Sequence, residues 1–112
     1  RAQVDIAKLN AEQAFWEYQD TLLSAVNEVE NALGQEQSLT QQQLQISKAL
    51  ASAKRSYSNY QSKYQQGLVD ILDLLTLQQQ VYDLQAQLSQ INYTLLTNRI
   101  DLGLALGLGV SP

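Results

Sequence analysis

The residues best suited to chemistry in this chain are its carboxylates, because the sequence contains neither histidine nor cysteine. Two carboxylates can act as general acid and base when both face one substrate. Glu28 and Glu30 stand two residues apart, however, and this spacing directs them to different sides of a helix. We interpret them as solvated charges. Without histidine or cysteine, most zinc sites and nucleophile–base pairs are also excluded. The sequence therefore predicts that the chain is not an enzyme and holds no metal or other cofactor.

The glycine-rich end is the other segment whose residue types are compatible with a binding role. Gly103, Gly107 and Gly109 follow no predicted strand, so they do not form a phosphate-binding loop. Two interpretations remain open. The favoured one is the end of a helix, where glycine commonly stops the helical backbone. The other is a small-residue surface against which a second element packs closely.

Charge and hydropathy exclude further classes of function. The net charge is −4 and no basic stripe is present, so we expect no nucleic acid partner and no polybasic membrane-surface helix. No stretch approaches the ~18 consecutive apolar residues that a membrane-spanning helix needs. The chain starts at Arg1 in a polar, amphipathic run without a signal peptide. We read this start as that of an internal piece of a larger protein, so it says little about localisation.

Two helices account for nearly all of the sequence. Residues 1–64 contain no proline and a single glycine, a length without breakers that is typical of a coiled coil. Gly67 interrupts the pattern, and helical periodicity resumes at Asp70. The sequence therefore predicts a helix over about 1–65, a tip turn over about 66–69, a second helix over about 70–102 and a glycine-rich end over 103–112.

Two apolar stripes with heptad spacing predict how these helices pair. The first stripe consists of Leu39, Gln43, Ile46, Leu50, Ala53, Tyr57 and Tyr60, and the second of Leu74, Leu77, Val81, Leu84, Leu88, Ile91 and Leu95. Pairing Tyr60 with Leu74 brings every later layer into register. Each Leu-sized side chain buried in a layer contributes ~1.5–3 kcal/mol. The predicted fold is all-α: a long antiparallel coiled-coil hairpin with unequal arms.

The first arm is longer than the second, which ends opposite about Val29 if the register continues. The residues before Val29 have no partner in the chain, yet they include eight large apolar side chains: Ile6, Leu9, Phe15, Trp16, Tyr18, Leu22, Leu23 and Val26. Apolar surface of this extent needs to be covered. We expect the covering element to be another copy of the chain or another part of its parent protein.

The turn has the residues that a tight helix–helix connection requires. Gly67 supplies a backbone conformation with positive φ. Asp70 is a good N-cap for the second helix, and Asp73 adds a negative charge to its first turn. Leu68 is left without a structural role, as an apolar residue at the extreme tip. An exposed leucine there indicates a docking surface, although a single exposed leucine is common.

Several segments resemble the TolC-type outer-membrane efflux proteins. Tyr64–Leu75, which reads YQQGLVDILDLL and is followed by Gln78, resembles the periplasmic tip of that family. Ser24–Leu33 is similar to a stretch of its long periplasmic helix. Ala105–Val110 is similar to the segment that closes the family's helical region, although Leu108 and Val110 depart from it. The resemblance extends over essentially the whole chain and is better to the second, C-terminal repeat of the family.

The resemblance implies a homotrimer in the full-length protein. Each protomer of such a trimer contributes strands to an outer-membrane β-barrel, absent from this fragment, and long helices to an α-barrel tunnel across the periplasm of a Gram-negative cell. This chain would be one helical hairpin of that tunnel. The tunnel would conduct drugs, metals or proteins outward as part of a tripartite pump, together with a periplasmic adaptor protein and an inner-membrane pump.

The resemblance also implies roles for residues at the tip. The adaptor-docking triplet of the family aligns with Gln66, Gly67 and Leu68, where Gln66 replaces a valine. The aspartate ring of the channel mouth aligns with Asp73, and a gate tyrosine aligns with Tyr64.

Two further gate residues of the family have no counterpart here. Thr76 stands in place of a second mouth aspartate, and Val69 stands in place of a tip arginine that helps to close the gate in some members. Two alternatives to the tunnel remain, the hairpin of a periplasmic adaptor and a generic coiled-coil interaction module. An adaptor hairpin would carry an Arg-Leu-Ser tip pattern, which is not found at this turn.

Overall fold

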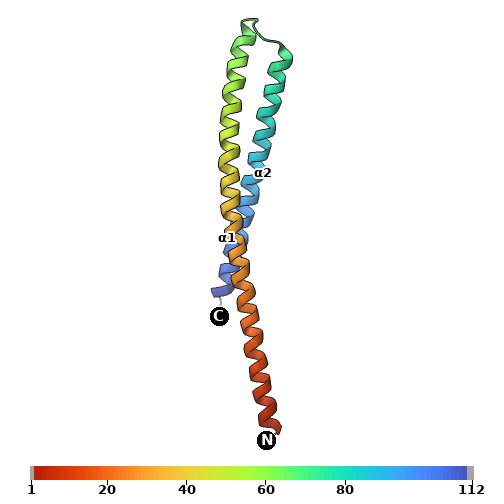
Figure 1. Ribbon diagram of the computed structural model, residues 1–112, viewed down its shortest axis with the longest axis vertical. Coiled ribbons are helices and arrows are strands. Elements are labelled where there is room, and N and C mark those ends of the chain that lie inside the picture. The colour runs from red at the N-terminus through yellow and green to blue at the C-terminus, as the bar shows by residue number, and fades with distance from the viewer. Residues whose placement is uncertain (1, 111–112) are drawn as a thin grey trace. The chain divides into compact units, whose positions relative to one another are not determined.

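The computed structural model describes residues 2–110, which form two helices. α1 spans Ala2–Gln65 and α2 spans Ile71–Val110, and residues 66–70 connect them (Figure 1). The predicted all-α fold is therefore confirmed. Contacts divide the chain into two units. We call residues 36–97 the hairpin unit, and residues 1–35 together with 98–112 the terminal unit.

The hairpin unit is held together by the two predicted stripes. Within this unit α1 and α2 run antiparallel and are joined at the turn (Figure 1). Every member of both stripes is buried or half-buried. The four most enclosed apolar side chains of the described chain all belong to these stripes: Leu50, Leu74, Val81 and Leu95. Leu95 is only 3% exposed. Burial thus confirms both predicted stripes.

A side-chain hydrogen bond across the same seam supports the predicted register. Gln43 donates through Nε2 to Oδ1 of Asn92 over 2.6 Å. The predicted pairing places Gln43 opposite Ile91, next to Asn92 in the sequence. A polar residue within an apolar seam needs such a partner, because an unsatisfied amide would carry a desolvation penalty.

The terminal unit is packed in a different way. Four residues of α1 are half-buried in this unit: Gln19, Ala25, Val29 and Ala32. The last three lie on one side of the helix, and among residues 98–107 of α2 the half-buried ones are Leu102 and Ala105. The buried residue of this unit is polar: Asn98, at 7% exposure. The paired surfaces therefore consist mostly of small side chains and one amide.

The N-terminal arm of α1 is exposed as far as Tyr18, but the predicted limit of pairing at about Val29 is wrong, because Leu22, Ala25 and Val26 line a groove together with Ala105 and Leu106 of the longer α2. All residues from Ala2 to Tyr18 are exposed, and Figure 1 shows this part of α1 continuing past the end of α2. Trp16, for example, is 61% exposed. Its ring contacts the ring of Phe15 edge-on, with the two ring centroids 5.7 Å apart. The arm therefore presents a series of large apolar side chains that the described chain leaves uncovered.

The predicted end of the second helix at about Leu102 is wrong, because α2 continues to Val110. A glycine stops a helix efficiently when it adopts positive φ. Among the described residues only Gly67 does so. Glycine inside a helix costs about 1 kcal/mol relative to alanine, and the leucine and alanine residues between these glycines favour the helix. Ser111 and Pro112, the last part of the predicted glycine-rich end, lie outside the described residues.

The alternative interpretation of these glycines, close packing, has no support at Gly103 or Gly107, the two whose surroundings the structure describes. A Cβ atom added at Gly103 or Gly107 would meet no atom within 4 Å. Neither position is crowded by a neighbouring element of the described chain. The boundary of the turn also shifts slightly, because Asp70 precedes α2 and belongs to the connection.

Candidate functional site

The turn at the tip is a glycine-terminated helix end. Gly67 has φ = 76°, and its N–H donates to the carbonyl of Tyr64 over 2.9 Å. The N–H of Leu68 reaches back to the carbonyl of Lys63, also over 2.9 Å. Together these two bonds form the Schellman motif, which satisfies carbonyl groups left over at the end of a helix. The backbone thus reverses direction with its polar groups paired.

The start of α2 is capped by Asp70. Its Oδ1 accepts a hydrogen bond from the N–H of Leu72 over 3.4 Å, the position that an N-cap side chain serves. The carbonyl of Asp70 accepts the first helical bond, from the N–H of Leu74. Asp73 lies in the first turn of α2, where a negative charge complements the helix dipole.

The docking residues suggested by the sequence lie together at the tip and are exposed. Gln66, Gly67 and Leu68 are consecutive in the turn, and Leu68 is 68% exposed. Of the two proposed mouth residues, Tyr64 lies in the last turn of α1 and is 41% exposed. Asp73 is exposed in the first turn of α2.

Sequence analysis missed an apolar extension of this surface. Leu68 is followed by three exposed apolar residues at the start of α2, and we call these four residues the tip cluster: Leu68, Ile71, Leu72 and Leu75. Ile71, Leu72 and Leu75 lie within about 100° of one another around α2, at 100° per residue, and Leu68 precedes them in the turn. The spacing is visible in the sequence. Leu74 and Leu77 already explain the seam, however, so the second apolar face of the helix is not needed to predict the fold. The tip therefore exposes leucine and isoleucine side chains as well as the carboxylate of Asp73.

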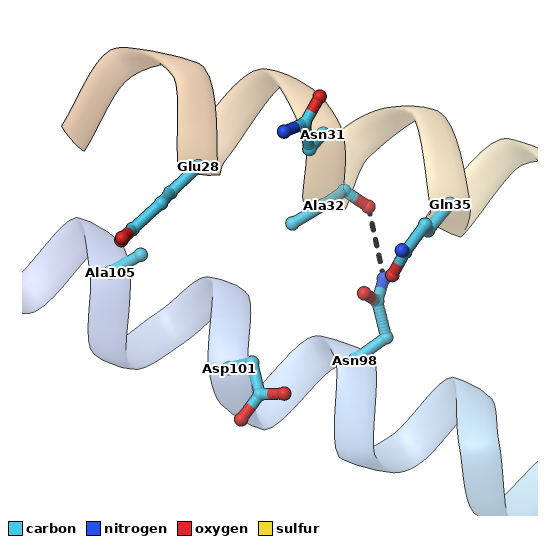
Figure 2. Close-up of a pocket in the computed structure, with 7 residues that line it drawn as sticks. All are labelled: Glu28, Asn31, Ala32, Gln35, Asn98, Asp101 and Ala105. Carbon is cyan, nitrogen blue, oxygen red and sulfur yellow. Dashed lines mark hydrogen bonds between the residues drawn. The ribbon is translucent and has the colours of Figure 1, made fainter. Parts of the chain in front are cut away.

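A second group of polar residues lines a cleft in the terminal unit. Figure 2 shows Glu28, Asn31, Ala32 and Gln35 on α1 facing Asn98, Asp101 and Ala105 on α2. The Asn98 amide donates through Nδ2 to the carbonyl oxygen of Ala32 over 3.0 Å. Glu28, interpreted from the sequence as a solvated charge, is exposed and projects toward Ala105.

The described residues contain no group of three or more side chains suited to a metal ion. Between residues 2 and 110, neither helix has a stretch long and apolar enough to cross a bilayer. What the tip and the exposed arm can offer is surface for contact with other helices. An all-helical hairpin with apolar residues left outside its own seam is suited to being one component of a larger helical wall.

Comparison with known proteins gives the class of protein to which such a hairpin belongs. The sequence model of a transport family, described as "Outer membrane efflux protein", matches residues 1–108. The chain belongs to this outer membrane efflux protein family.

Curated relatives support the same assignment. The cation efflux system protein CusC of Escherichia coli strain K12 is 31% identical over 109 residues, which cover 97% of this chain and 24% of that protein. CusC of E. coli O157:H7 is 30% identical over the same length and the same shares. The chain therefore spans about a quarter of the length of the curated relatives it matches. No solved structure matched the chain significantly.

Proposed function

We propose that this chain is one helical hairpin of the periplasmic tunnel of an outer-membrane efflux channel, and that its tip docks a periplasmic adaptor protein. The observation that carries the proposal is a family match along nearly the whole chain, combined with a helical fold whose large apolar residues lie mostly outside its own seam. A passive conduit needs a helical wall and contact surfaces and no catalytic groups, which fits the absence of histidine and cysteine.

The exposed arm of α1 supports a place in a helical wall. Phe15, Trp16 and Leu23 are all more than half exposed. Their burial against further helices would contribute roughly 25 cal/mol for each Å² removed from water. In the proposed tunnel these helices come from the rest of the parent protein, since the chain is about a quarter as long as its relatives, and from the other protomers of a trimer.

The tip supports a docking role through its shape and its composition. The backbone hydrogen bonds of the turn hold Gly67 in place, while Gln66 and Leu68 on either side of it are exposed. An exposed leucine cluster on a rigid turn can be buried at little entropic cost, because its backbone is already ordered. The partner we propose is the helical hairpin tip of an adaptor that links the channel to an inner-membrane pump.

Asp73 and Tyr64 are the residues we propose for the channel mouth. Repetition in a trimer would place several copies of the Asp73 carboxylate around one axis, which favours cations and repels anions at the entrance. The relatives are named as cation efflux system proteins. Inorganic cations are therefore the first class of cargo to test with the intact channel.

The experiment that tests the docking role is Leu68→Asp in the intact parent protein. We expect cells carrying this variant to lose export while the protein still assembles as a trimer, because a charge on the docking surface cannot be desolvated against an apolar partner. The measurements are resistance to the exported compound and the size of the detergent-extracted protein.

Two matched variants complete this experiment. Gln61→Asp adds the same charge to an exposed position nearby on α1, and Leu68→Met keeps an apolar side chain at the tip. Both are expected to retain export. Full resistance in the Leu68→Asp cells would contradict the docking role of the tip.

A further inference from the structure

The terminal unit pairs its helices through an unexpected choice of surfaces. On α2 the side facing α1 carries Asn98, Leu102 and Ala105, while Ile100 and Leu104 are 56% and 61% exposed. At 3.6 residues per turn, Ile100 and Leu104 lie on the opposite side of the helix from Asn98. Rotating α2 by half a turn would bury Ile100 and Leu104, expose the half-buried Leu102 and Ala105, and return the Asn98 amide to water. Burial of apolar area alone would favour that rotated pairing.

The observed pairing instead encloses Asn98, which is only 7% exposed. Its amide donates to the carbonyl oxygen of Ala32 over 3.0 Å, and Figure 2 shows the side chain crossing from α2 to the α1 backbone. The acceptor is a backbone group, so the bond requires only that the residue on α1 is small enough to let the amide approach. Ala32 meets this requirement.

We propose that Asn98 is the specificity-determining residue that selects which face of α2 packs against α1 in the terminal unit. A single polar residue in a helix–helix seam is known to fix pairing at some cost in stability, because alternative pairings leave its polar atoms without partners. The selection keeps two large apolar residues of α2, Ile100 and Leu104, on its exposed side. The proposal does not depend on what the hairpin tip contacts.

One competing cause exists for the same arrangement. The heptad stripe of α2 continues in the sequence from Leu95 through Asn98, Leu102 and Ala105. If continuity of this stripe alone sets the face, then any apolar residue at position 98 would serve equally well. The experiment therefore has to separate the hydrogen bond from the position of the residue in the stripe.

Disulfide cross-linking of the 112-residue chain, which has no cysteine of its own, makes this separation. Cysteines at Val29 and Ala105 report the observed pairing, because both residues line one groove of the terminal unit. Cysteines at Val29 and Leu104 report the rotated pairing. With Asn98 present, we expect the intramolecular Val29–Ala105 cross-link to form about tenfold faster or more, a discrimination within the range of one buried hydrogen bond. Formation is followed by gel mobility.

Asn98→Leu is expected to bring the two cross-linking rates to within about threefold of each other, while circular dichroism shows unchanged helix content. Asn98→Asp, which keeps the shape of the side chain and removes the amide donor, serves if the leucine variant aggregates, and the same loss of preference is expected. A folded variant of either kind that keeps the tenfold preference overturns the proposal.

Thr97→Leu is the matched control, since it adds the same apolar side chain one residue away at an exposed position. We expect the tenfold preference to persist in this variant. An equal loss of preference in Thr97→Leu would assign the effect to added hydrophobicity and overturn the role of Asn98.

Discussion

The hairpin unit and the terminal unit are built from the same two helices, but they bury different kinds of residue. In the hairpin unit the helices enclose leucine and valine, and the four buried apolar residues of the described chain are all found there. In the terminal unit the helices enclose Asn98, while leucine, isoleucine and aromatic residues are exposed. One unit thus satisfies its apolar surface internally, and the other leaves most of it outside.

This difference indicates that the residues that stabilise the fold and the residues that define how the helices pair lie mostly in different units. Apolar layers in the hairpin unit supply stability directly. Small residues and a hydrogen bond in the terminal unit supply little apolar burial, but they hold a defined arrangement. Large apolar residues that are kept out of a pair need an outside partner.

The most direct test of this difference is to truncate one large side chain in each unit. Leu95→Ala removes a side chain that is 3% exposed, and we expect it to lower the free energy of unfolding of the chain by about 2–5 kcal/mol. Trp16→Ala removes a larger side chain that is 61% exposed, and we expect a change of less than about 0.5 kcal/mol. Urea denaturation followed by circular dichroism measures both. Equal losses would mean that the N-terminal arm is covered in solution.

Two glycine substitutions sharpen the same comparison with smaller effects of opposite sign. Gly67→Ala in the turn forces a side chain into positive φ and should destabilise the chain by about 1–2 kcal/mol. Gly107→Ala in the helical part of the terminal unit meets open space and should stabilise it by up to about 1 kcal/mol. Thermal unfolding compares the variants. Destabilisation by Gly107→Ala would indicate that α2 ends before this residue.

The smallest expected difference concerns two aspartates. Asp70→Ala removes the cap of α2 and should cost about 1 kcal/mol. Asp101→Ala changes an exposed carboxylate within α2 and should alter stability by less than about 0.5 kcal/mol. Asp70→Asn is the control for capping, because its side-chain oxygen can still accept the hydrogen bond. If the asparagine variant lost as much stability as the alanine variant, charge and not capping would be the cause.

The sequence was sufficient to predict the hairpin unit because its layers repeat. Pairing Tyr60 with Leu74 fixes every other layer, so one correct choice of turn determines the whole seam. It was also sufficient to identify the exposed arm, since residues such as Trp16 have no counterpart across the seam. Regular burial leaves a periodic trace in the residue types, and that trace is readable without a structure.

Three features escaped prediction, and the first two leave no such trace in the sequence. The end of α2 was placed at Leu102 because glycine is a common helix terminator, but termination depends on a positive φ that residue type alone does not dictate. Asn98 was not singled out because a lone asparagine on a helix is usually solvated, and its acceptor is a backbone carbonyl that belongs to no recognisable motif. The leucines beside Leu68 were overlooked because they form a second face of a helix whose first face already explained the fold.

In the turn at the tip, the residues that reverse the chain differ from the residues whose side chains face outward. The reversal of the chain depends on Gly67 and Asp70, whereas Gln66 and Leu68 take part in it only through their backbone groups. The side chains at Gln66 and Leu68 can therefore be replaced during evolution without changing the fold of the hairpin. In the docking role proposed for the tip, one or two substitutions at Gln66 and Leu68 would change the partner while Gly67 and Asp70 preserve the turn.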